Sequence, residues 1–217
     1  MNGNTAQKDN NRLKSIAQVL IAIICAVIFA SVITGAVFDT TRISGRSMDD
    51  TLYGGKSGDP HYDAVHFDVI PQNTFFDRFF FGGADTFGDK VLLLRTTKVS
   101  RGDIVVFMSD YETRGVYQQW IKRVIGVAGD NVRISGGKVY LNGEELCEDY
   151  ATGTTAPYVG SEETWTVGEN EIFVLGDNRE NSTDSRVIGC VDAADIVGRV
   201  LLVFKKDTKK IVGAKNL

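Results

Sequence analysis

Two side chains that stand far apart in the sequence could together perform acyl transfer. Ser47 lies in the segment ISGRSMDDTL, and Lys122 lies inside an apolar segment, WIKRVIGV. A serine hydroxyl is a weak nucleophile until a base accepts its proton. A lysine removed from water tends toward its uncharged amine, which can act as that base near neutral pH. The two residues therefore predict a serine nucleophile that a lysine activates.

The histidine content of the chain favours lysine as the base. There are only two histidines, His61 and His66, and both lie in a stretch without a regular strand or helix pattern. A Ser-His-Asp triad would have to recruit one of them from that stretch. Since alternate residues of a strand face opposite sides, either Lys122 or its neighbour Arg123 is expected to point into the interior.

A dense polar cluster follows the apolar segment EIFVL. Every position from 177 to 183 is charged or polar within LGDNRENSTDSRVIG. A solvated loop held by Asx turns is one interpretation of this cluster. The other is a buried polar network, in which Ser182 donates a hydrogen bond to the lysine amine and the Asp184 and Arg186 pair fixes the loop.

Short segments rich in β-branched and aromatic residues must position these groups. They recur between glycine-containing turns as DKVLLLRTT, GDIVVFM, WIKRVIGV, NVRI, KVYLNG, EIFVLGD and DIVGRVLLVF. Such runs are typical of strands and hairpins, and no segment after residue 38 keeps a helical period over three turns. The predicted fold is mainly β. Two stretches interrupt the pattern: an irregular, aromatic-rich insert at 53–87 and a smaller inserted lobe at 131–170.

An apolar stretch at 16–38 has no charged residue and is long enough to cross a bilayer as a helix. A cleaved signal peptide is the alternative, but the stretch exceeds an ordinary signal-peptide core and lacks a clear cleavage motif. Lys8, Arg12 and Lys14 precede it, so residues 1–15 are expected in the cytoplasm and residues 39–217 outside, as the catalytic domain. The lipid bilayer is thus an expected partner.

Charge and cysteine content exclude some classes of partner and site. With 24 Lys+Arg against 28 Asp+Glu, the chain lacks the surplus of cations that nucleic acid binding needs. Cys147 and Cys190 could form a disulfide outside the cell or remain free thiols. The segment HYDAVHFD offers metal ligands, but its spacing fits no standard site, so neither a metal nor another cofactor is expected.

Four segments behind the apolar stretch resemble, in order, those of bacterial type I signal peptidases, membrane-anchored Ser/Lys proteases that remove signal peptides from exported proteins. SGRSMDDTL is similar to the nucleophile segment of that family and RGDIVVF to its next core strand. IKRVIGVAGD is similar to the lysine segment and GDNRENSTDSR to the C-terminal segment. The resemblance covers most of residues 39–205 apart from the two irregular stretches.

The resemblance implies a role for each matching residue. Ser47 matches the nucleophile, Lys122 the general base, and Ser182 the serine that orients the lysine. Gly45 stands where many members have a serine that completes the oxyanion hole, and Met48 is expected beside it at the oxyanion and substrate-binding region. The supporting polar residues are Asp177, Asp184 and Arg186.

The resemblance also implies a fold: a coiled antiparallel β core with a smaller inserted β lobe, preceded by one N-terminal transmembrane helix. Two features depart from the family. Asp50 replaces a usual proline, which is expected to loosen the nucleophile turn, and the insert at 53–87 separates that turn from the next strand. The aromatic segment FFDRFFFGG within the insert could enter the membrane interface or pack as a small hydrophobic cluster.

The expected function is cleavage of signal peptides from exported preproteins, with specificity for small residues before the cut. Two alternatives remain: a Ser/Lys protease dedicated to pilin-like or other surface substrates, and a non-catalytic, membrane-tethered assembly factor. The presence of Ser47, Lys122 and the whole GDNRENSTDSR segment counts against the second. The sequence leaves the oligomeric state open.

Overall fold

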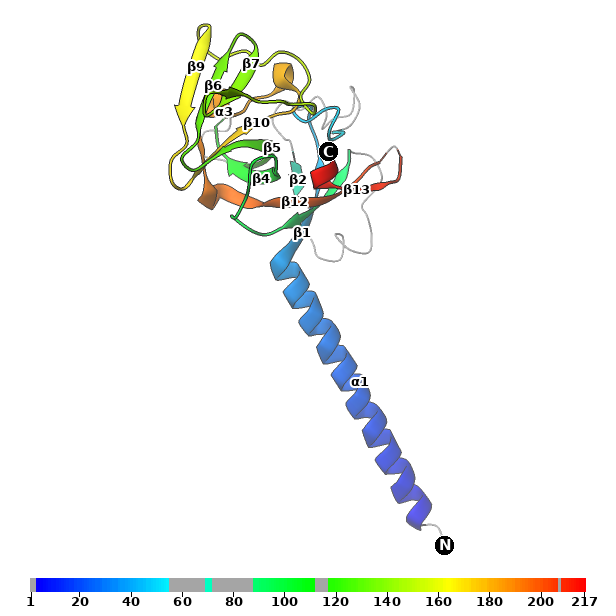
Figure 1. Cartoon of the computed structure of the whole chain (residues 1–217). Coiled ribbons are helices and arrows are strands. Elements are labelled where there is room, and N and C mark those ends of the chain that lie inside the picture. Colours follow the sequence, from blue (N-terminus) through cyan, green and yellow to red (C-terminus); the bar gives the residue numbers. More distant parts are fainter. Residues whose placement is uncertain (1–2, 55–68, 72–87, 112–116, 207) are drawn as a thin grey trace. The chain divides into compact units, whose positions relative to one another are not determined.

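The computed structural model describes residues 3–54, 69–71, 88–111, 117–206 and 208–217. The chain divides into two compact units, Met1–Phe38 and Asp39–Leu217. The first unit is one long helix, α1 (Gly3–Val37), and the second is built mainly from strands (Figure 1).

Helix α1 has the length and composition of a membrane span. Its segment Lys14–Val37 contains 24 residues with a mean hydropathy of 2.9, and such a helix is about 36 Å long, more than the roughly 30 Å hydrocarbon core of a bilayer. Its large apolar side chains are exposed, including Phe29 at 68%. An apolar helix of a soluble core would bury these side chains, so α1 is a candidate membrane anchor.

The larger sheet of the second unit contains nine strands, and every register defined for it is antiparallel. In spatial order they are β11 (Val191–Asp192), β10 (Glu171–Leu175), β5 (Gln118–Val127), β4 (Ile104–Ser109), β12 (Ile196–Phe204), β3 (Lys90–Leu94), β1 (Phe38–Ile43) and β2 (Val69–Pro71), with β13 (Ile211–Gly213) paired to β12. Strand β5 lies between β4 and β10, so its residues are buried over most of its length.

The smaller sheet has four strands and lies within the stretch 131–170. Its order is β8 (Glu144–Glu145), β7 (Lys138–Leu141), β6 (Asn131–Ser135) and β9 (Glu162–Thr166). Figure 1 shows β6, β7 and β9 grouped beside β10 and β5. One hydrophobic cluster joins the two sheets, because Ile125 and Phe173 from the larger sheet pack with Val132 and Ile134 from the smaller.

Among the described residues of the second unit, the helices are short. They are α3 (Ser185–Ile188) and the 3-10 turns η1 (Arg179–Asn181), η2 (Ala193–Asp195) and η3 (Ala214–Asn216). The prediction of a mainly β, antiparallel fold behind one N-terminal apolar helix is therefore confirmed.

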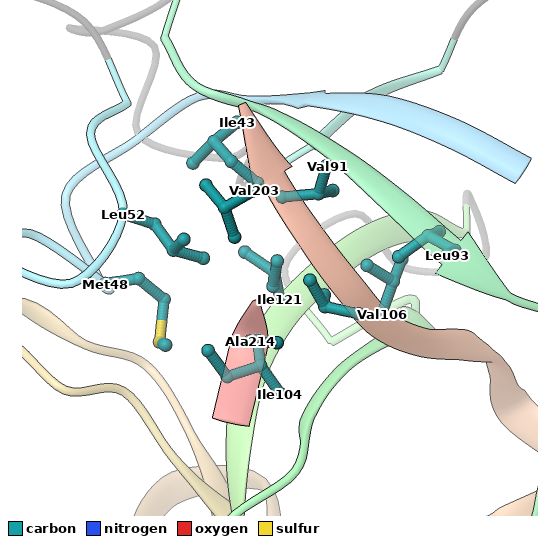
Figure 2. Close-up of a cluster of buried hydrophobic side chains, with 11 residues drawn as sticks. Ile43, Met48, Leu52, Val91, Leu93, Ile104, Val106, Ile121, Val203 and Ala214 are labelled. Carbon is teal, nitrogen blue, oxygen red and sulfur yellow. The ribbon is translucent and has the colours of Figure 1, made fainter. Parts of the chain in front are cut away.

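The turn that contains Ser47 is fixed on the main hydrophobic core. Met48 and Leu52 are buried in the same cluster as Ile121 of β5 and Val203 of β12, as Figure 2 shows. Burying a side chain of this size stabilises a fold by about 1.5–3 kcal/mol. The turn is therefore attached to the sheet by side chains on both sides of its centre.

Most of the predicted insert at 53–87 lies outside the described residues, including HYDAVHFD and FFDRFFFGG. Within this stretch, which the sequence indicated to be irregular, Val69–Pro71 form strand β2 and pair with Thr41–Ile43 of β1. The pairing extends the larger sheet by one short edge strand. Cys147 and Cys190 are free thiols in the structure.

The nucleophile turn has one residue in a left-handed conformation. Asp50 has φ of 76°, and the turn is closed by the N–H groups of the next two residues, Thr51 and Leu52, which donate to the Met48 carbonyl at 3.1 and 2.7 Å. Proline fixes φ near −65° and could not adopt this conformation. The turn therefore has a hydrogen-bonded geometry of its own, and the loosening that we expected from the loss of proline stays a prediction.

Replacing Asp50 with the family's proline is therefore expected to destabilise this chain. Asp50→Pro should lower the free energy of unfolding by more than about 1 kcal/mol, since the native φ is incompatible with the ring. Asp50→Gly should raise it by up to about 1 kcal/mol, because glycine adopts positive φ without strain. Tryptophan fluorescence during denaturant unfolding measures this, since both tryptophans, Trp120 and Trp165, lie in the second unit.

Asp49→Gly is the matched control, because Asp49 is not among the residues with positive φ. Glycine there should lower stability through its greater freedom in the unfolded chain. Equal stability of Asp50→Pro and the unchanged chain would contradict the left-handed turn.

Candidate active site

The structure brings Ser47 and Lys122 together. Ser47 lies in the turn after β1 and Lys122 in the middle of β5, 75 residues later, yet Lys122 Nζ and Ser47 Oγ are hydrogen-bonded at 2.9 Å. Both residues are buried, Ser47 at 5% and Lys122 at 1% exposure. A nucleophile and its base need this separation for direct proton transfer.

Strand β5 buries both of its adjacent cations. We expected only one of Lys122 and Arg123 to point inward, but Arg123 is also just 3% exposed. The difference arises because both faces of β5 are covered: Trp120 and Val124 pack in one hydrophobic cluster, and Ile121 packs in another. Neither face of β5 therefore offers solvent in which the second cation could lie.

A bidentate ion pair neutralises the second cation. Arg123 donates from Nε and Nη2 to the two carboxylate oxygens of Asp177 at 2.9 and 2.7 Å, and from Nη1 to the Gly102 carbonyl at 3.1 Å. The guanidinium also lies 3.9 Å from the centre of the Tyr150 ring. Removing one partner of such a pair would leave a buried charge uncompensated, at a cost of about 3–5 kcal/mol. The pair attaches the polar segment 176–186 to β5, close to the lysine.

Asn178 connects the same segment to the nucleophile turn. Its backbone N–H donates to the Ser47 carbonyl at 3.0 Å, and its side-chain Nδ2 donates to the Arg46 carbonyl at 3.0 Å. Gly176 allows this approach, since a Cβ there would lie 2.5 Å from the Ser47 carbonyl oxygen. We did not predict Asn178 as a site residue, although it lies within the polar cluster that drew attention to the segment.

Ser182 does not make the contact that we predicted. Its Oγ is buried and has no hydrogen-bond partner among the residues that the structure describes, so the expected bond to the Lys122 amine is not formed. The Oγ lies against Gly176, where a Cβ would approach it to 2.2 Å. The role of Ser182 as the residue that orients the lysine therefore stays a prediction.

Asp184 and Arg186 form the predicted pair. Arg186 donates from Nε and Nη2 to the Asp184 carboxylate at 2.8 and 2.9 Å, and Asp184 also accepts the Gly176 N–H at 3.0 Å. The Arg186 guanidinium reaches the Arg179 carbonyl at 2.8 Å. The carboxylate therefore fixes both ends of the segment that carries Asp177 and Asn178.

A second buried arginine of the segment, Arg179, contacts the loop after β8. Arg179 donates to both Glu148 oxygens at 2.8 and 2.6 Å and to the Thr155 hydroxyl at 2.5 Å. Tyr150 donates to Glu148 at 3.0 Å; burial, with the adjacent Glu148 charge, raises the pKa of Tyr150, so its phenol stays protonated. The interpretation of a buried polar network thus fits segment 176–186 better than that of a solvated loop.

Gly45 and Met48 lie on either side of Ser47 in different environments. Gly45 has φ of 89°, and its carbonyl packs against Gly54. The Met48 side chain belongs to the hydrophobic core, and its sulfur accepts the Asp177 N–H at 3.5 Å. The Met48 side chain therefore anchors the turn in the core, and its predicted place in the oxyanion and substrate-binding region stays a prediction.

The arrangement is suited to acyl transfer by a serine with an adjacent amine base. Among the described residues, no group of three or more His, Cys, Asp and Glu side chains could hold a metal ion.

Comparisons with known proteins point to one family. The family model described as signal peptidase, peptidase S26, matches residues 16–205. The signal peptidase I of Bacillus licheniformis is 28% identical over 212 residues, which cover 92% of this chain and 94% of that protein. The signal peptidase IB of Staphylococcus aureus is 28% identical over 207 residues, which cover 88% of this chain and 90% of that protein.

A solved structure is also similar in sequence. The crystal structure of a signal peptidase I from Enterococcus faecalis V583 matches with 34% identity and a TM-score of 0.39, covering 47% of this chain and 96% of that one. The family match extends from the apolar helix through β12 and includes Ser47, Lys122 and segment 176–186. The chain belongs to the signal peptidase family, peptidase S26.

Proposed function

We propose that this chain is a type I signal peptidase, a serine endopeptidase that cleaves N-terminal signal peptides from exported preproteins. The observation that carries the proposal is the 2.9 Å separation of Ser47 Oγ and Lys122 Nζ in a buried site. Membership of the signal peptidase family supplies the class of substrate.

In the acylation step, the uncharged Lys122 amine takes the proton of Ser47 as Oγ attacks the scissile carbonyl carbon. The carbonyl oxygen becomes an oxyanion, which the Ser47 backbone N–H and neighbouring donors would stabilise. The carbon–nitrogen bond then breaks, and the Lys122 ammonium gives its proton to the leaving amine. That amine is the new N-terminus of the mature protein.

In the deacylation step, Lys122 is again uncharged and takes a proton from water as the water oxygen attacks the ester carbon. The ester bond to Ser47 breaks, and the serine oxygen recovers its proton from the lysine. The signal peptide leaves with a free carboxylate. Asn178 supports both steps, because its two hydrogen bonds to the Arg46 and Ser47 carbonyls limit movement of the nucleophile.

The preprotein would bind as an extended strand beside Ser47, with small residues before the cut. The chain between Phe38 and Ser47 can extend at most about 30 Å. Ser47 would therefore act near the membrane surface, where the cleavage site of a signal peptide emerges.

We further propose that α1 spans the membrane with its N-terminus in the cytoplasm and residues 39–217 outside. The support is the apolar segment Lys14–Val37 and the cations Lys8, Arg12 and Lys14 at its N-terminal side. The bilayer is then a partner of the protein. Nucleic acid is disfavoured as a partner, because the chain has more acidic than basic residues.

Replacing either member of the Ser47–Lys122 pair should abolish cleavage of a preprotein and leave the fold intact. Ser47→Ala removes the nucleophile, and Lys122→Met removes the base but keeps most of the side-chain volume. Each change should lower kcat/KM by about 10³-fold or more. Cleavage is measured by the appearance of mature protein with the full chain in detergent or proteoliposomes.

Ser161→Ala and Lys206→Met are the matched controls, because both residues are exposed, and both variants should cleave at the unchanged rate. Substantial cleavage by Ser47→Ala in a correctly folded protein would refute the proposed function. Loss of cleavage without any effect of the controls would exclude the alternative of a non-catalytic assembly factor.

The exposed thiol of Cys147 tests the proposed topology. A membrane-impermeant maleimide should label Cys147 on intact spheroplasts at pH 8.5, where the thiol reacts although the adjacent Asp149 raises its pKa. Cys190 should stay unlabelled, because burial raises its pKa to about 11 and shields the sulfur. Mass spectrometry of the peptides locates the label.

Cys147→Ser should remove the label from intact spheroplasts. Labelling of Cys147 only after the membrane is permeabilised would contradict the proposed orientation.

A further inference from the structure

One buried carboxylate closes the base of the nucleophile turn. Asp89 immediately precedes β3 and is only 1% exposed. Its backbone carbonyl accepts the Ile43 N–H at 2.8 Å, and its own N–H donates to the Tyr53 carbonyl at 2.7 Å. Ile43 and Tyr53 stand on either side of the turn that contains Ser47. A single residue therefore holds the two ends of that turn together.

The close packing of backbone at this point explains why the two ends meet. Glycine precedes Asp89, and a Cβ on Gly88 would lie 2.3 Å from the carbonyl oxygens of both Ile43 and Tyr53. The same Cβ would lie 2.9 Å from the Gly54 Cα. The chain thus enters the insert after Gly54 and returns at Gly88 at nearly the same point, so the turn is closed independently of the insert.

The Asp89 side chain extends this closure to the C-terminal part of the chain. Its Oδ2 accepts the Tyr53 N–H at 3.0 Å, and its Oδ1 accepts the Lys206 N–H at 2.9 Å. Lys205 Nζ forms an ion pair with Oδ2 at 3.1 Å. Lys205 also donates from Nζ to the Thr51 carbonyl, four residues after Ser47.

Lys205 is itself fixed by the hairpin between β12 and β13, because its N–H donates to the Lys210 carbonyl at 2.9 Å (Figure 1). Asn178 contacts the turn at Arg46 and Ser47, whereas the Asp89–Lys205 pair contacts it at Tyr53 and Thr51. The serine therefore lies between two separate attachments, one from the polar segment and one from the C-terminal hairpin.

We propose that the Asp89–Lys205 pair is a positioning element that keeps Ser47 Oγ within reach of Lys122 during catalysis. The inference rests on the proposed function and adds a residue pair outside the polar segment to the machinery. The pair acts on Ser47 indirectly, through the hydrogen bonds that it makes to the backbone of Thr51 and Tyr53. A displacement of the nucleophile by about 1 Å can cost about 10²-fold in rate.

The test compares Lys205→Met with Lys206→Met in the full chain. Lys205→Met keeps the aliphatic stem but removes the ammonium group from Thr51 and Asp89. We expect kcat for preprotein cleavage to fall about 10- to 100-fold, with KM within about two-fold, because substrate binding does not depend on the ammonium. Lys206→Met is the matched control, since this neighbour contacts Asp89 only through its backbone N–H, and it should keep the unchanged kcat.

Two additional variants separate positioning from a general loss of stability. Lys205→Arg keeps the charge and should restore kcat to within about three-fold of the unchanged chain. Asp89→Asn removes the charge and also replaces one of the two oxygens that accept the Tyr53 and Lys206 N–H groups. Its effect on kcat should therefore be at least as large as that of Lys205→Met, and the double variant should lose less than the two single losses combined, because both remove the same ion pair. Hydrogen exchange of the amides at 48–53 should rise in Lys205→Met while exchange in β5 stays unchanged.

Unchanged kcat and unchanged exchange in Lys205→Met would overturn the proposal. An equal loss in Lys206→Met, or a Lys205→Arg variant as slow as Lys205→Met, would overturn it as well. Failure of the proposed function would look different, since the chain without any substitution would then not cleave preproteins at all. The exchange measurement reports on the turn without requiring cleavage.

Discussion

The 2.9 Å separation of Ser47 Oγ and Lys122 Nζ is the constraint that the contacts around the site must maintain. One atom lies on a turn and the other on a central strand, so their separation is set by how the turn is attached to the sheet. Met48 and Leu52 fix the turn to the core through apolar packing. Asn178 and the Asp89–Lys205 pair fix its backbone from different directions.

Burial of charge in this region is extensive, and the surrounding residues compensate it. Lys122 lies beside Arg123, and both are removed from water. The Asp177 carboxylate neutralises Arg123 with two hydrogen bonds, and Arg179 is paired with Glu148 in the same way. Unpaired burial of a charge costs several kcal/mol. The lysine can therefore be removed from water for use as a base without a second unpaired cation beside it.

The chemistry could be predicted from the sequence because it depends on residue types. Ser47 was a weak candidate by its neighbours alone and became a strong one in combination with Lys122, the polar segment and the family resemblance, while the short apolar runs indicated a mainly β fold. The contacts that depend on three-dimensional placement could not be predicted. The alternation of side chains along a strand predicted that one of Lys122 and Arg123 would be buried. Both are buried, because both faces of β5 are covered. Asn178 donates a hydrogen bond to the backbone carbonyl of Ser47, and Ile43 donates one to the backbone carbonyl of Asp89. Every residue has a backbone carbonyl, so the sequence does not indicate which of them will accept such a bond.

The replacement of proline by Asp50 shows the same limit. The residue type predicted a looser turn, whereas the backbone adopts a left-handed conformation that proline could not, closed by hydrogen bonds to the Met48 carbonyl. Ser182 shows the opposite case, because its residue type predicted a bond to Lys122 that the structure does not contain among its described residues. Residue type alone was therefore not enough to predict either the conformation of Asp50 or the contacts of Ser182.

The most direct measurement of the central claim is the location of the acyl group during turnover. The full chain would be mixed with a preprotein, quenched with acid, digested with trypsin and analysed by mass spectrometry. Because Arg46 immediately precedes Ser47, trypsin separates Ser47 from Ser44 into different peptides. We predict that the peptide starting at Ser47 carries the C-terminal part of the signal peptide as an ester. An adduct on any other residue would contradict Ser47 as the nucleophile.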